Sequence, residues 1–122
     1  MDNIRGAALF IGNLVGPPAT TGTINNTIFS DNSNSDDYAA GVGTFVNTSV
    51  TFTDCEVTDN QASNMGIMVL DTSGSELYSV NTSWRRNTPY DISLTDGGSL
   101  LGSFDMDGET DFTCSVTAND CY

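Results

Sequence analysis

The chain has 122 residues, the length of one domain, and a net charge of −13 from 16 acidic side chains against three arginines. It contains no histidine and no lysine, which excludes Ser-His-Asp and Cys-His catalysis, imidazole metal ligands, Schiff bases and Walker-type phosphate loops. Such an acidic surface repels phosphate backbones, so we expect no nucleic-acid partner.

The first residues, MDNIRGAALFIGN, do not resemble a secretory signal peptide, because they lack a basic start and their apolar stretch is interrupted. No run of 18 apolar residues occurs anywhere, so we expect no membrane span. Residues 6–11, GAALFI, alternate in the manner of a strand. Similar stretches follow at residues 39–45, 65–70 and 90–94. Their alternation predicts one column of Leu9, Val42, Ile67 and Ile92, and a second of Ile11, Thr44, Val69 and Leu94.

Between these stretches the chain repeats a short segment that ends in asparagine. The asparagines are spaced by 29, 28, 27 and 32 residues, at Asn3, Asn32, Asn60, Asn87 and Asn119. A bulky apolar residue stands three positions before four of them, at Phe29, Val57, Trp84 and Val116. Farther upstream stand small residues at Thr27, Cys55, Thr82 and Cys114, and apolar residues at Ile24, Phe52, Val80 and Phe112.

Short strands that repeat every 27–32 residues predict a right-handed parallel β-helix of about four coils, occupying residues 1–122 as one all-β domain. Equivalent residues would stack one above another, the apolar residues would fill the coil, and each asparagine would occupy a left-handed corner and bond to the next asparagine. A β-sandwich with ordinary turn asparagines is the alternative. Because Asn3 is already in phase and no cap precedes it, we expect a fragment or an uncapped segment of a longer solenoid.

The F-x-x-N pattern of Phe29 to Asn32, with Val57, Trp84 and Val116 in the Phe position, resembles the repeats of chlamydial polymorphic membrane proteins. More broadly it resembles the right-handed β-helix, or pectin-lyase-like, superfamily. The resemblance implies the β-helix architecture, and it implies adhesion or surface display as a function. Enzymes of this fold that resemble pectate lyase combine calcium-binding carboxylates with a basic Arg or Lys.

Two cysteines share a predicted column, Cys55 and Cys114, but they would lie two coils apart. That separation of about 9.6 Å exceeds the range of a disulfide, so we expect them not to bond to each other. Cys121 could reach Cys114 only if the last coil folds back. The sequons at Asn25, Asn47 and Asn81 are candidate glycosylation sites, and Asn25 and Asn81 are expected to face outward because they follow inward Ile24 and Val80.

The acidic segment FDMDGETDF, residues 104–112, is the candidate metal site. Its alternating carboxylates surround a glycine and suit Ca²⁺, at Asp105, Asp107, Glu109 and Asp111, although a solvated acidic loop is the alternative. No other cofactor is expected. Elsewhere, Asp59 and Arg86 should be neighbours one coil apart and form an exposed ion pair. The T-x-T pairs at 21–23 and 51–53 do not recur in later coils, so no ice-binding array is expected.

These features predict a non-catalytic structural or adhesive segment of a secreted or surface protein, or an accessory subunit of a larger assembly. Its partners would be other chains at the open coil edges, or further copies of itself. The alternative is a carbohydrate-active β-helix, a polysaccharide lyase or hydrolase or a fragment of one, with Asp59 and Arg86 at its centre.

Overall fold

The computed structural model describes residues 9–12, 20–35, 40–71, 74–95, 98–102 and 114–116, and these residues form strands and turns without any helix. Within these described residues, three parallel sheets contain all the strands. Sheet A holds β1 (Leu9–Gly12), β4 (Gly43–Val46), β7 (Gln61–Asp71), β10 (Thr88–Thr95) and β12 (Cys114–Val116). Sheet B holds β2 (Thr20–Asn25), β5 (Thr48–Thr53), β8 (Glu76–Val80) and β11 (Ser99–Gly102), and sheet C holds β3 (Ile28–Ser30), β6 (Glu56–Thr58) and β9 (Ser83–Arg85).

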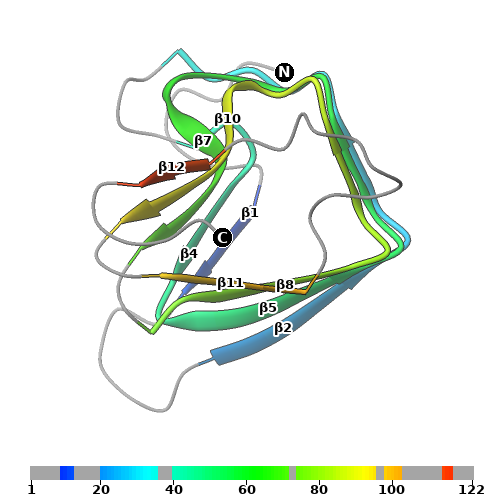
Figure 1. Ribbon diagram of the computed structural model, residues 1–122, viewed down its shortest axis with the longest axis vertical. Coiled ribbons are helices and arrows are strands. Elements are labelled where there is room, and N and C mark those ends of the chain that lie inside the picture. The colour runs from blue at the N-terminus through cyan, green and yellow to red at the C-terminus, as the bar shows by residue number, and fades with distance from the viewer. Residues whose placement is uncertain are drawn as a thin grey trace.

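From β1 to β9 the chain visits sheets A, B and C in a fixed rotation, so each strand pairs with its counterpart from the next round. Figure 1 shows the result: β2, β5, β8 and β11 line one side of the outline, and β1, β4, β7 and β10 line another. The expectation of parallel strands repeating along the chain is confirmed. Antiparallel hairpins, which a β-sandwich would contain, are absent from the described residues.

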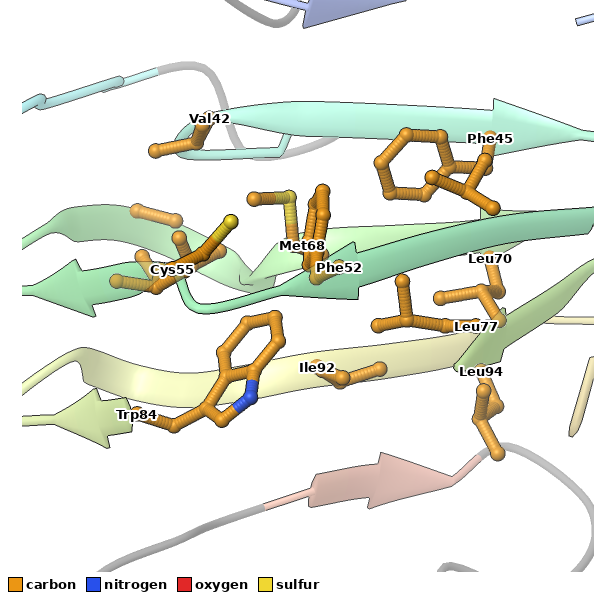
Figure 2. Packing of buried hydrophobic residues seen from close by; sticks show 14 residues of the cluster. Val42, Phe45, Phe52, Cys55, Met68, Leu70, Leu77, Trp84, Ile92 and Leu94 are labelled. Carbon is orange, nitrogen blue, oxygen red and sulfur yellow. The ribbon is translucent and has the colours of Figure 1, made fainter. Parts of the chain in front are cut away.

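The strands form because their residues alternate between the interior and the solvent. In β5 the buried positions are Thr48, Val50 and Phe52, and the residues between them are half-buried. The cores of sheets B and C meet at Phe52, whose ring centroid lies 6.0 Å from that of Phe29 and 5.8 Å from that of Trp84. Figure 2 shows Trp84, Phe52, Met68 and Ile92 directed into one shared interior between the strands.

The predicted column of Phe29, Val57 and Trp84 is confirmed, because these residues are paired in register across β3, β6 and β9. Its fourth member is wrong. Val116 pairs with Leu94 in sheet A, so it does not stack on Trp84 in sheet C. The same strand places Cys114 beside Ile92, outside the column of Cys55. Val57 and Val116, which stand at the same offset from an asparagine, therefore belong to different sheets.

The two columns predicted for sheet A are shifted by one residue in the middle strands. Leu9 and Ile92 are in register with Gly43 and Met68 rather than with Val42 and Ile67. Likewise, the column of Ile11 and Leu94 contains Phe45 and Leu70, not Thr44 and Val69. The reason is packing: Val42, Ile67 and Val69 are also buried, so a run of apolar residues does not fix which alternate set faces inward.

Val80 was expected to face inward, and this is wrong, because its exposure is 44%. It is in register with Thr53, whereas Ser79 takes the inward position opposite Phe52. The indole of Trp84 occupies the interior here, and its Nε1–H donates a hydrogen bond of 3.1 Å to Ser79 Oγ. A buried indole N–H requires an acceptor, and a valine at this position would not supply one.

Candidate functional site

The stacked asparagines form a hydrogen-bonded ladder beside sheet C. Asn32 Nδ2 donates to Asn60 Oδ1 at 2.9 Å, and Asn60 Nδ2 donates to Asn87 Oδ1 at 3.0 Å. Each accepting oxygen also receives the backbone N–H of the preceding asparagine, at 3.1 Å from Asn32 and 3.0 Å from Asn60. The amides of Asn60 and Asn87 donate in addition to the backbone oxygens of Phe29 and Val57, each at 2.9 Å. The predicted bonding between Asn32, Asn60 and Asn87 is confirmed.

The conformation predicted for these asparagines is wrong, because the residue before each one is left-handed instead. Asp31, Asp59 and Arg86 have φ values of 55°, 56° and 51°. These residues turn the chain, and the next residue then points its amide inward along the stack. A second left-handed column, at Asn26, Asp54 and Asn81 with φ values of 49°, 53° and 47°, marks the corner between sheets B and C. Asn and Asp tolerate this region best, so Arg86 is the exception.

At Asn87, the last described asparagine of the ladder, a buried carboxylate accepts the next hydrogen bond. Asp91, which lies within β10, is 1% exposed and accepts a hydrogen bond of 2.6 Å from Asn87 Nδ2. Its Oδ1 accepts from Asn87 Nδ2 as Asn60 Oδ1 accepts from Asn32 and Asn87 Oδ1 accepts from Asn60. Sequence reasoning missed Asp91, because it lies only four residues from Asn87 and belongs to none of the repeated columns. Asn3 and Asn119, the two outer members of the predicted ladder, lie outside the described residues.

The expected ion pair between Asp59 and Arg86 is present at the exposed corner of sheet C. Arg86 Nε donates to Asp59 Oδ1 at 2.6 Å, and its Nη2 donates to Asp59 Oδ2 at 2.7 Å. The side chains are 62% and 40% exposed for Arg86 and Asp59, respectively. The hydrogen bond from Arg86 lowers the pKa of Asp59, and a bond from the Thr58 hydroxyl acts in the same direction against the opposing effect of desolvation. A carboxylate held in this state is a weak base.

A shallow hollow of about 390 Å³ lies at the other corner, between sheets B and C. It is lined by Asn26, Ile28, Asp54, Cys55, Glu56, Asn81 and Ser83. Cys55 is a free, buried thiol whose S–H can donate a hydrogen bond to the backbone oxygen of Ile24 or Thr53, each 3.3 Å from Sγ. This confirms that it is a small core residue. Asn81 donates to the carboxylate of Asp54, so one amide and one acid of this hollow are already paired with each other.

The outer face of sheet B carries short polar side chains at one end and apolar ones at the other. Thr23 and Thr51 are in register, and the next residue in that row is Tyr78. The neighbouring row runs from Asn25 through Thr53 to Val80. Tyr78 and Val80 interrupt the threonine rows, so the two T-x-T pairs do not extend into an array on this face.

The candidate calcium ligands Asp105, Asp107, Glu109 and Asp111 lie outside the described residues, as does Cys121. Within the part of the chain that the structure describes, no three His, Cys, Asp or Glu side chains gather closely enough to hold a metal ion. The structure brings Asp59 next to Arg86, and it separately joins Asn32, Asn60 and Asn87 by hydrogen bonds. It also stacks the predicted column of Phe29, Val57 and Trp84.

Comparisons with protein-family models, with curated proteins and with solved structures give no match to this chain. Over the described residues, no helix has the length and apolar character required to cross a membrane.

Proposed function

We propose that this chain is a right-handed parallel β-helix of about four coils and that it serves as a non-catalytic, rigid structural segment of a secreted or surface protein. One observation carries the proposal: three successive rounds of the chain place Phe29, Val57 and Trp84 in register beside a continuous asparagine ladder. Right-handedness follows from the strong bias of crossovers between parallel strands. The resemblance to β-helix surface proteins supports the same assignment.

The chemistry of the one predicted catalytic pair supports a structural role. Asp59 and Arg86 use both carboxylate oxygens and two guanidinium nitrogens on each other. A polysaccharide lyase would instead need a basic group directed at a bound sugar, with carboxylates free to hold a cation. The pair is better suited to fixing the corner at which two left-handed residues are stacked.

The partners that we propose are other protein chains that dock on exposed strand edges, within an adhesive surface structure or a larger assembly. Parallel strands at the end of a stack leave backbone groups that can pair with a further strand. The net charge of −13 favours partners with basic or cation-bridged surfaces and keeps free copies apart. The calcium site at residues 105–111 stays a prediction.

An activity screen separates this proposal from the carbohydrate-active alternative. The purified chain is incubated with acidic and neutral polysaccharides, with and without Ca²⁺, while unsaturated products and reducing ends are measured. We expect no turnover for the natural chain, Asp59→Ala or Arg86→Ala. Turnover by the natural chain that disappears in both variants would overturn the proposal, provided that both variants remain folded by circular dichroism.

A further inference from the structure

The three sequons lie in different environments, and these environments decide which asparagine can carry a sugar in the folded chain. N-linked glycosylation joins a bulky, hydrophilic group to an asparagine side chain, so the product requires open solvent at that position. The three asparagines are Asn25 at the end of β2, Asn47 between β4 and β5, and Asn81 after β8. Two of them are engaged with their surroundings.

Asn47 is half-buried in a left-handed turn, with φ of 49°. Its backbone N–H donates to Ser75 Oγ at 2.9 Å. Its side-chain Oδ1 lies against the next round of the chain, only 2.2 Å from the point that a Cβ on Gly74 would occupy. Because Oδ1 and Nδ2 belong to one planar amide, a sugar on Nδ2 would be held close to the turn at Gly74 and Ser75.

Asn81 is exposed, but its side-chain amide is hydrogen-bonded at the left-handed corner between sheets B and C. Its Nδ2 donates to Oδ1 of Asp54, the residue above it in the same column. It also lines the hollow with Ser83, the third residue of its own sequon. A sugar on Nδ2 would crowd the Asp54 carboxylate and the floor of this hollow.

Asn25 differs from both. Its side chain is exposed on the outer face of sheet B, and this side chain, unlike the Asn25 backbone, makes no hydrogen bond to any described residue. Its backbone is an ordinary strand position in register with Thr53, so the turn at Asn26 does not depend on the Asn25 amide. The third sequon residue, Thr27, donates from Oγ1 to the Asn25 backbone oxygen at 2.8 Å and leaves the Asn25 side chain free.

The structure assigns Asn25 as the position at which this fold accepts an N-linked oligosaccharide, and it assigns Asn47 and Asn81 as sequons that the fold rejects. The donor class is an oligosaccharide carried on a polyprenyl pyrophosphate. In the transfer, Nδ2 of Asn25 forms a bond to the anomeric carbon while the bond from that carbon to the pyrophosphate oxygen breaks. The lipid pyrophosphate leaves, Nδ2 loses one proton, and no group is oxidised or reduced.

The test is to express the full chain behind a secretory leader in eukaryotic cells and to map glycans on the secreted, folded protein. Enzymatic release of N-glycans in heavy-oxygen water converts each occupied asparagine into a labelled aspartate, which peptide mass spectrometry locates. We expect the label at residue 25 alone. Secreted folded protein that lacks a glycan at residue 25, or carries one at 47 or 81, would overturn the assignment.

Variants give an independent check. Asn25→Gln and Thr27→Ala should each abolish the electrophoretic shift produced by the glycosidase, whereas Thr27→Ser, which keeps the sequon, should retain it. Asn47→Gln and Asn81→Gln are matched controls and should leave the shift unchanged. If Asn25→Gln is not secreted, the comparison of Thr27→Ala with Thr27→Ser and the map of the natural chain still decide the matter. Loss of the shift in either control, or its persistence in Thr27→Ala, would contradict the assignment.

Discussion

At the scale of single residues, Asn60 is the middle member of the three described asparagines of the ladder. It is 1% exposed, its Nδ2 donates to Asn87 and to the Phe29 backbone oxygen, and its Oδ1 accepts two hydrogen bonds from Asn32. Removing the amide would leave several buried groups without partners. Each such group costs roughly 1–3 kcal/mol.

We therefore expect Asn60→Ala to lower the free energy of unfolding by about 3 kcal/mol, as measured by urea denaturation followed by circular dichroism. Asn32→Ala is the matched control. Asn32 stands at the end of the described ladder and is half-buried, so its loss should cost clearly less. Equal losses in the two variants would show that the ladder does not stabilise the interior as the structure indicates.

The Asp59–Arg86 pair should make stability depend on pH in one direction. Because the folded-state pKa of Asp59 is lowered, the pair stabilises the fold above the unfolded-state pKa of about 3.9, and this contribution is lost as the pH falls through the lower folded-state value. Asp59→Asn should thus lower the melting temperature slightly at pH 7 and not at all well below pH 3. Salt should reduce the difference, because the pair is exposed. A difference that grows in acid would contradict this assignment.

At the scale of elements, Gly66 sets the spacing between β7 and β10. A Cβ at this position would lie 2.4 Å from the backbone carbon of Ile92 and the backbone nitrogen of Ser93. Backbone atoms cannot move aside as a flexible side chain can. We expect Gly66→Ala to destabilise the fold by about 3 kcal/mol or more, at the upper end of overpacking costs, measured by thermal unfolding.

Gly41→Ala provides the comparison for Gly66→Ala. The nearest atom to a Cβ on Gly41 is Cδ1 of Ile67, at 2.7 Å, which is the flexible end of a side chain. This variant should be distinctly less destabilised than Gly66→Ala. The opposite order would mean that the backbones of β7 and β10 are farther apart than described.

The single tryptophan reports on the junction of sheets B and C. Trp84→Ala would remove the contact with Phe52 and leave Ser79 without its indole donor, so we expect a loss of about 3–5 kcal/mol in unfolding free energy. Trp84→Phe should lose less, because it keeps most of the apolar volume. In the natural chain, the emission maximum of a buried indole should lie at shorter wavelength than in the unfolded chain. Emission that does not shift on unfolding would place Trp84 in solvent.

The sequence predicts where the strands of sheets A and C lie. It does not predict the register of sheet A correctly, because apolar and polar residues do not alternate clearly there. Phe29, Val57 and Trp84 could be aligned because each stands at a fixed offset from an asparagine, and the ladder enforces that offset. Val42, Ile67 and Val69 could not be placed, because several successive residues there are apolar and buried. Ser79 and Asp91 were missed for another reason. Their roles depend on one partner each, Trp84 and Asn87, and not on a repeating pattern.

At the scale of the whole molecule, the shared interior should make unfolding cooperative. Cys55 is buried between sheets B and C, and its Sγ is directed at backbone oxygens. We expect alkylation of Cys55, followed by peptide mass spectrometry, to proceed only at the rate of global unfolding and to accelerate with urea in step with the loss of circular dichroism. Rapid alkylation of Cys55 in the native protein would show that this corner opens on its own.

The seven described non-glycine residues with positive φ turn the chain at recurring positions, and all but Arg86 are Asn or Asp. Each round contains the left-handed residues that produce its own bends. We therefore expect that one round can be duplicated without changes to the rounds beside it. A tandem copy of residues 54–80, the span between two equivalent corners, should lengthen the rod while every other pair of stacked residues keeps its partner type. An insertion that does not span the distance between two equivalent corners, 27 or 28 residues in the described chain, should break the register of every strand that follows it.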